Sequence, residues 1–204
     1  MNEVNINNNN SSVYFGQILE KYISEHYTSN YEEIIILCIG TDRCTGDSLG
    51  PLTGHKLERR IKGYSNVYLH GTLDEPVHAK NLEETIKLIN NSYKKPFIIA
   101  IDACLGDINR VGCIKVSNGP LKPGAGVNKN LPPIGDINIL GIVNLAGFME
   151  FMILQNTRLQ VVMKMADDIS RGIEYALWKT IKDIKSKEYI NEEYREADIR
   201  YLKI

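Results

Sequence analysis

Residues 34–50 read IIILCIGTDRCTGDSLG, and they give the strongest structural signal in the chain. The first six residues form a continuous apolar run, rich in β-branched side chains, that Gly40 ends. A run of this kind is typical of a parallel strand covered on both faces. Residues 51–61 follow the loop and begin with Pro51, which favours a helix start. The stretch therefore predicts a buried strand, a loop that contains Asp47, and a helix.

The rest of the chain continues this alternation of strands and helices. Residues 118–133 are rich in Gly and Pro and are predicted to form a loop. Strands that alternate with helices form a mainly parallel sheet between helix layers. The predicted fold class is therefore α/β, with three layers in the order αβα. The further strands are expected at residues 66–70, 97–101, 112–116 (near the sheet edge) and 137–143, and the further helices at residues 13–27, 79–90 and 146–183, the last with a break near Asn156.

The chain has 204 residues, 43% of them apolar and 24% charged, which fits a single domain with a sizeable core. Its first residues, MNEVNINNNNSS, are polar and rich in Asn. They lack the basic start and the apolar stretch of a secretory signal. We therefore predict a disordered tail at residues 1–12 and a single α/β domain at residues 13–204.

Charge and cysteine usage restrict the partners and the compartment. The net charge is -1, which gives no reason to expect binding to nucleic acid or to an anionic membrane. No apolar run reaches the roughly 18 residues that a membrane-spanning helix needs. The four cysteines have no CxxC spacing and no paired histidines, which argues against a structural zinc site. We expect a cytoplasmic protein with reduced cysteines, and neither nucleic acid nor membrane as a partner.

Two carboxylates stand where an α/β sheet binds its ligands. Asp47 lies in the loop after the first buried strand, and Asp102 directly follows residues 97–101. Ligands of open α/β sheets bind beyond the carboxyl ends of the strands. Two neighbouring carboxyl groups can divide the roles of base and acid towards a water molecule, or can hold a divalent cation. The alternative is structural: Asp47 or Ser48 caps the next helix, and Asp102 holds its own loop.

Residues near these aspartates are candidates for substrate binding. Gly46 and Gly50 permit a tight turn and close approach of a substrate backbone. His78, in DEPVHAKNL, is either a third polar group at the site or an exposed histidine in the first turn of a helix. A nucleophile built from Cys44 and His78 is a further alternative. The candidate substrate-binding residues are Gly46, Ser48, Asp42, His78, Gly124 and Gly126.

Met and aromatic residues recur at helical spacing in two later segments, residues 148–154 (FMEFMIL) and 161–169 (VVMKMADDI). Core packing accounts for this spacing, so we expect both segments to be buried. The polar residues between them are expected to cap and turn the chain.

Three segments resemble known families. IGTDRCTGDSLGPL, IDACLGD and GPLKPGAGVNKNLPPIGDINILGIVN closely resemble the sporulation protein family called YyaC (DUF1256), a resemblance that extends over residues 31–178. The same segments are similar to the germination protease of endospore formers, which has a D-x-L-G-P pattern, a strand ending in I-D-A and a P-G-(S/A)-G-V loop. Both families are similar to hydrogenase maturation proteases. The resemblance implies a fold like that of the hydrogenase maturation proteases and of the phosphorylase/hydrolase-like proteins.

By this resemblance Asp47 matches the aspartate of D-x-L-G-P, and Asp102 matches the aspartate of I-D-A. These two form the proposed catalytic pair of the germination protease, so the resemblance implies that Asp47 and Asp102 are catalytic. In maturation proteases, acidic residues at these places bind a metal together with a later histidine, whereas residues 116–130 (VSNGPLKPGAGVNKN) contain no histidine. We expect no cofactor, with a weakly bound divalent cation as the alternative.

Two functional hypotheses follow. The first is a sporulation-associated, peptidase-like hydrolase in which Asp47 and Asp102 activate water to hydrolyse a peptide bond, in the cytoplasm of the sporulating cell or the spore interior. The second is a non-catalytic regulatory protein of sporulation that binds a peptide or protein on the same scaffold. In both, the expected partner is a peptide or protein, and the sequence leaves the oligomeric state undetermined.

Overall fold

The structure is a computed structural model that describes residues 2–123 and 131–201, with side chains up to Ile181. Every predicted strand and helix is present, and β4 and the last helix extend beyond their predicted ends. The strands are β1 (Glu3–Asn5), β2 (Glu33–Cys38), β3 (Val67–His70), β4 (Pro96–Gly106), β5 (Cys113–Asn118) and β6 (Ile137–Leu145). The helices are α1 (Ser11–His26), α2 (Leu49–Leu57), α3 (Leu82–Ser92), α4 (Glu150–Gln155) and α5 (Leu159–Tyr201), with short 3-10 turns η1 (Gly46–Ser48) and η2 (Ile108–Arg110).

In the described part of the chain, six strands form one sheet in the order β1-β5-β6-β4-β2-β3. β3, β2, β4 and β6 run parallel to one another. β5 is antiparallel to β6, and β1 is antiparallel to β5. Parallel neighbours need crossover connections, and α2 and α3 lie in the connections from β2 to β3 and from β3 to β4. The predicted α/β class with a mainly parallel sheet is confirmed.

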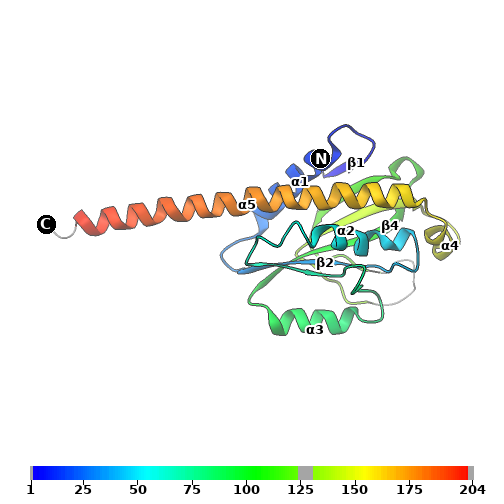
Figure 1. Ribbon diagram of the computed structural model, residues 1–204, viewed down its shortest axis with the longest axis horizontal. Coiled ribbons are helices and arrows are strands. Elements are labelled where there is room, and N and C mark those ends of the chain that lie inside the picture. Colours follow the sequence, from blue (N-terminus) through cyan, green and yellow to red (C-terminus); the bar gives the residue numbers. More distant parts are fainter. Residues whose placement is uncertain (1, 124–130, 202–204) are drawn as a thin grey trace.

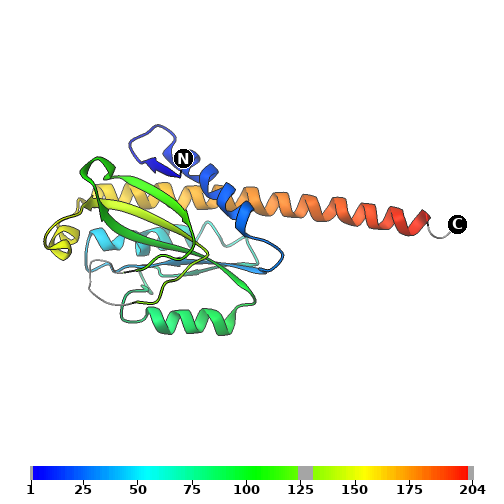
Figure 2. The ribbon, with the colours of Figure 1, turned by 180° about the vertical axis from the view of Figure 1, so that it is seen from behind.

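Helices cover both faces of the sheet, with α1, α2 and α5 on one face and α3 on the other (Figure 1 and Figure 2). Successive side chains of a strand point to opposite faces, so β2 contributes to both layers. Ile34 and Ile36 pack with the first helix group, whereas Ile35 and Leu37 pack with α3. All four are fully buried. The continuous apolar run of β2 therefore follows from a strand covered on both sides, and the three-layer arrangement is confirmed.

The predicted disorder of residues 1–12 is wrong for the residues that the structure describes. Glu3–Asn5 form β1, which adds an edge strand to β5, and α1 already begins at Ser11. Val4 and Ile6 are only 7% and 3% exposed, because alternation places both on the core side of this short segment. Arg110 also forms an ion pair with Glu3. Burial and pairing with a distant strand thus order a segment whose composition alone suggests disorder.

The chain after β6 forms two helices separated by a break near Asn156, as predicted. Asn156 Nδ2 donates a hydrogen bond to the Met152 carbonyl at 2.8 Å, and Thr157 Oγ1 donates one to the Ile153 carbonyl at 3.0 Å. These side chains satisfy carbonyl groups that the end of α4 leaves without a helical partner. The polar residues at the break therefore cap and turn the chain.

The two Met-rich segments differ in burial. Val162, Met165 and Ile169 of α5 are fully buried, which confirms core packing for residues 161–169. The same prediction for residues 148–154 is wrong, because α4 contains no buried residue and Phe148 is 98% exposed. Apolar spacing predicts a helix with an apolar side, but it does not say whether another element covers that side.

Candidate active site

The candidate active site lies where the sheet changes the direction in which strands are added. From β2 the chain places β3 on one side and then returns to place β4 on the other side of β2. Ligands of open α/β sheets bind outside the carboxyl ends of the strands at such a switch point. The ladder between β2 and β4 ends with the pair Cys38 and Ile101, one residue before Asp102. β2 and β4 are therefore no longer paired from Asp102 onward, and the gap between the two strands begins at this residue.

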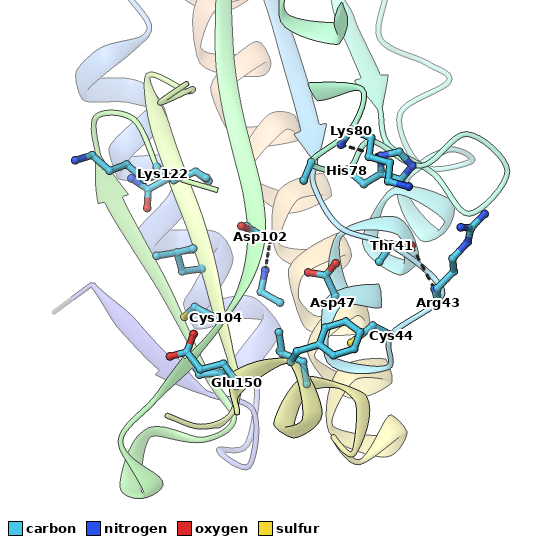
Figure 3. A pocket seen from close by; sticks show the side chains of 18 of the residues that line it. Thr41, Arg43, Cys44, Asp47, His78, Lys80, Asp102, Cys104, Lys122 and Glu150 are labelled. Carbon is cyan, nitrogen blue, oxygen red and sulfur yellow. Dashed lines mark hydrogen bonds between the residues drawn. The ribbon is translucent and has the colours of Figure 1, made fainter. Parts of the chain in front are cut away.

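A cavity of about 830 Å³ lies at this opening (Figure 3). Its volume is within the range of about 300–1,000 Å³ that is usual for small-molecule sites. The wall is formed by β4, β5 and β6, the loop after β2, the segment before α3, the segment after β5, and α4. Acidic, basic and apolar side chains all contribute to this wall. The lining residues that matter most for the chemistry are Asp47, Asp102, His78, Lys80, Glu150 and Phe151.

Asp47 reaches the cavity from η1, the turn between β2 and α2. The Thr41 N–H donates a hydrogen bond to the Asp47 carbonyl at 3.1 Å, which closes the loop. Burial raises the pKa of the Asp47 carboxyl group, while the Thr41 backbone amide and the charge of His78 act in the opposite direction. A carboxyl group with a raised pKa keeps its proton to higher pH, as a general acid requires.

Asp102 lies within β4 and not after it, because the strand continues beside β6 as far as Gly106. The predicted strand end at residue 101 is therefore wrong, although the β2 partner does stop there. The Asp102 side chain is 6% exposed, and its Oδ1 accepts a hydrogen bond from the Ala103 N–H at 2.8 Å. A backbone donor of this kind stabilises the charged form of a carboxyl group. Asp47, from the turn that follows β2, and Asp102, from the neighbouring parallel strand β4, thus line one cavity (Figure 3).

His78 lies in the cavity wall and is partly buried, so the structure favours its role as a third polar group over that of an exposed histidine. It precedes the first turn of α3, where its backbone N–H donates to Asn81 Oδ1 at 2.8 Å. The influence of its charge on Asp47 places the two groups within electrostatic reach. Lys80 lies on the same side of the cavity in Figure 3.

Three other predicted substrate-binding residues do not line the cavity. Gly46 is buried, and a Cβ there would lie 2.8 Å from Leu154 Cδ2, so Gly46 permits packing against α4 and not approach of a substrate. Ser48 is buried and donates its hydroxyl to the Thr45 carbonyl at 2.6 Å, which also means that it does not cap α2. Asp42 is exposed and lies outside the cavity wall.

Gly50, which was also expected to permit close approach of a substrate, has a different role. A Cβ on Gly50 would lie 2.0 Å from the Ile39 carbonyl oxygen, so this glycine lets α2 approach the end of β2. It therefore serves the packing of the fold and not the substrate. Gly124 and Gly126 lie outside the described residues.

The two cysteines at the cavity have raised pKa values, which disfavours the thiolate form. Burial raises the pKa of Cys44, and burial together with the Asp102 charge raises the pKa of Cys104 to about 11. In the part of the chain that the structure describes, no hydrogen bond joins Cys44 to His78. The alternative of a Cys44–His78 nucleophile is therefore not supported, since a thiolate is the reactive form. All four cysteines are free.

Within the described ranges 2–123 and 131–201, no group of three or more His, Cys, Asp or Glu side chains is placed to hold a metal ion. Two carboxylates alone would leave most coordination positions of a hard cation to water. The expectation of no cofactor, with a weakly bound divalent cation as the alternative, therefore stays a prediction.

Several cavity residues were not predicted from the sequence. Glu150, Phe151 and Leu154 come from α4, and they line the cavity together with Lys122, which follows β5. The Gly/Pro-rich character of the segment around Lys122 and the apolar character of α4 are visible in the sequence, but nothing local indicates that both converge on Asp102. Their contribution depends on the order of strands in the sheet.

The fold and the site define a three-layer αβα protein with a carboxyl-lined cavity at the switch point of its sheet. Residues 3–172 match the family described as "Protein of unknown function (DUF1256)", and the chain belongs to this family. Over 140 residues the chain is 54% identical to "Uncharacterized protein YyaC" of Bacillus subtilis (strain 168). The matched region covers 69% of this chain and 67% of that protein. The resemblance to the YyaC family is thereby confirmed.

Among solved structures, the fold is similar to that of the NiFe hydrogenase maturation protease HycI from Thermococcus kodakarensis KOD1. The sequence identity is 16% and the TM-score is 0.49, over 78% of this chain and 98% of that chain. In the part of the chain that the structure describes, no helix is long and apolar enough to pass through a membrane.

Proposed function

We propose that the protein is a peptidase-like hydrolase of sporulation, in which Asp47 and Asp102 activate water to cleave a peptide bond. The observation that supports this most is the placement of both carboxyl groups in one cavity at the switch point of the sheet. A peptide as substrate is inferred from the D-x-L-G-P and I-D-A motifs shared with the germination protease. The same resemblance suggests the cytoplasm of the sporulating cell or the spore interior as the place of action.

The surroundings of the two aspartates suggest different roles. Asp102 accepts the Ala103 N–H, which holds its carboxyl group in place at the cavity, so we assign it as the base towards water. Asp47 has a pKa raised by burial, so we assign it as the acid that protonates the leaving amine. Two carboxyl groups in unequal environments are the usual means of obtaining one acid and one base from the same residue type.

The hydrolysis then balances without a further reactant. Asp102 takes a proton from water as the water oxygen bonds to the carbonyl carbon of the peptide. The C–N bond breaks as Asp47 gives its proton to the departing nitrogen. Asp102 then returns its proton through water to Asp47, which restores the starting state.

The rival hypothesis is a non-catalytic protein that holds a peptide in the same cavity. One observation favours it: the Asp102 Oδ1 already accepts a backbone hydrogen bond from its own strand, as a purely structural aspartate would. The two hypotheses differ in whether bound peptide is cleaved.

The test is incubation of the purified full-length protein with a pool of synthetic peptides of diverse sequence, followed by mass spectrometry. Asp47→Asn and Asp102→Asn should each lower the cleavage rate by about 10²–10⁴-fold, the usual contribution of a general acid or base. Asp42→Asn is the matched control, because Asp42 lies in the same loop as Asp47 but outside the cavity. Cleavage that survives both substitutions would refute the assignment, and peptide binding without cleavage in the wild type would favour the rival.

A further inference from the structure

Exposed apolar side chains gather on one short segment next to the cavity. Eleven large hydrophobic residues of the described chain are exposed, and five of them lie within residues 145–152. We call these five side chains the 145–152 surface. They are Leu145 (42% exposed), Phe148 (98%), Met149 (69%), Phe151 (54%) and Met152 (51%). Single exposed apolar residues are ordinary, but a contiguous group of this size marks a binding surface.

The 145–152 surface is continuous with the cavity. Phe151 belongs to both, since it is half exposed and also lines the cavity, and its neighbour Glu150 lines the cavity as well. Figure 3 shows Glu150 at the edge of the cavity, across from His78. A bound polypeptide that is too long for the cavity must extend out of it. Phe151 offers an apolar contact at this point, because it joins the cavity wall to the 145–152 surface.

The segment is held in place although its apolar side chains are uncovered. Asn144 Nδ2 donates to the Ile153 carbonyl at 3.2 Å and to Thr157 Oγ1 at 3.2 Å, which ties the end of β6 to the end of α4. Met149 precedes the helix with a left-handed backbone (φ 61°), a conformation that bulky residues rarely adopt. The fold thus keeps the Met149 side chain exposed although its backbone conformation is unfavourable.

The chemistry of the surface favours an apolar polypeptide over an anionic membrane. Between Asn144 and Thr157 the only charged residue is Glu150, so the surface lacks the Lys and Arg that bind anionic lipid. The five side chains expose an area on the order of 600 Å², enough for a short apolar segment of a polypeptide to cover. Met and Phe side chains adapt to varied apolar partners.

We propose that the 145–152 surface binds an apolar segment of the polypeptide whose neighbouring residues enter the cavity. This assignment rests on the proposed function, because it names the part of the substrate that lies outside the carboxyl pair. With this surface the protein would prefer polypeptide substrates that carry an apolar segment next to the residues bound at Asp47 and Asp102.

The test uses fluorescence anisotropy with two labelled peptides in the full-length Asp47→Asn background, where cleavage does not disturb binding. One peptide carries a central Leu-Ile-Phe-Leu block flanked by Gly and Ser, and in the other the block is replaced by Ser. The double change Phe148→Gln and Met152→Gln should weaken binding of the apolar peptide by about tenfold or more, as loss of two apolar contacts predicts. Leu88→Gln is the matched control, since Leu88 of α3 is 52% exposed, close to the 51% of Met152.

Three outcomes would overturn the proposal. The first is equal binding by the double variant and its parent, and the second is equal binding of the apolar and the Ser peptide. The third is a wild-type dimer, seen by analytical ultracentrifugation, that the double variant dissociates, because a second copy would then occupy the surface. Absent cleavage by the wild type with surface-dependent binding intact would refute only the hydrolase, so the two proposals fail separately.

Discussion

Replacing Gly40 by Ala should displace the turn that carries Asp47. Gly40 directly follows Ile39 at the end of β2 and has φ +144°, which side chains other than that of Gly rarely adopt. A Cβ at this position would lie 2.0 Å from the Asp47 carbonyl oxygen and 3.1 Å from Pro51 Cδ. Ordinary contact begins near 3.4 Å, so the Asp47 backbone must move away by about 1.4 Å.

The cost of this substitution has two parts. The unfavourable φ costs about 1–3 kcal/mol and the overpacking about 1–3 kcal/mol, so the free energy of unfolding should fall by about 2–6 kcal/mol. A displacement of this size at a catalytic group lowers the rate by about 100-fold. The control is Gly63→Ala, because a Cβ on Gly63 meets nothing within 4 Å, and its stability should change by no more than about 1 kcal/mol.

Urea denaturation gives the free energy of unfolding of both variants, and peptide cleavage at a temperature where both are folded gives kcat/KM. If Gly40→Ala were as stable and as active as Gly63→Ala, the close contact between Gly40 and the Asp47 turn would not exist as described. The stability result stands by itself even if no cleavable peptide is found.

Three further predictions concern titratable groups at the cavity. The folded-state pKa of Asp47 is raised above its usual 3.8, so the wild type loses stability as pH rises from 3.8 through the folded-state pKa. Asp47→Asn should therefore have the higher Tm near neutral pH, and the difference in Tm should shrink as pH falls towards 3.8. Asp102→Asn keeps an oxygen to accept the Ala103 N–H, so thermal unfolding should show a change of less than about 1 kcal/mol, whereas a loss of about 1.5–3 kcal/mol would assign Asp102 a structural role. Cys104, with a pKa of about 11, should react with iodoacetamide slowly at neutral pH and faster towards pH 11, as mass spectrometry of the alkylated peptide would record; fast alkylation at neutral pH would contradict its protonated state.

Local sequence signals predicted the central sheet well. Residues 34–38 of β2 and 97–101 of β4 are all apolar because helices cover both faces of the sheet, and that property is visible without knowledge of partners. Segments whose structure depends on distant partners were not predictable in this way. β1 contains one apolar residue, Val4, and exists because it pairs with β5, more than a hundred residues later in the chain.

The candidate site was partly predictable for the same reason. Asp47 and Asp102 stand out in the sequence because each follows an apolar run that predicts a buried strand, and a parallel sheet brings such positions to one edge. His78 remained ambiguous, since its exposure depends on how the segment before α3 meets the loop after β2. The contribution of α4 was missed because helical spacing in FMEFMIL fits a covered and an uncovered helix equally well.

The central claim is that Asp47 and Asp102 act together on one peptide bond. It is tested most directly by kcat/KM for the best-cleaved peptide with the wild type, Asp47→Asn, Asp102→Asn and the double variant. Residues that act as a unit have strongly non-additive effects. We predict that each single substitution lowers kcat/KM by about 10²–10⁴-fold and that the double substitution lowers it little further. Independent effects that multiply in the double variant, or full activity in either single variant, would contradict the account.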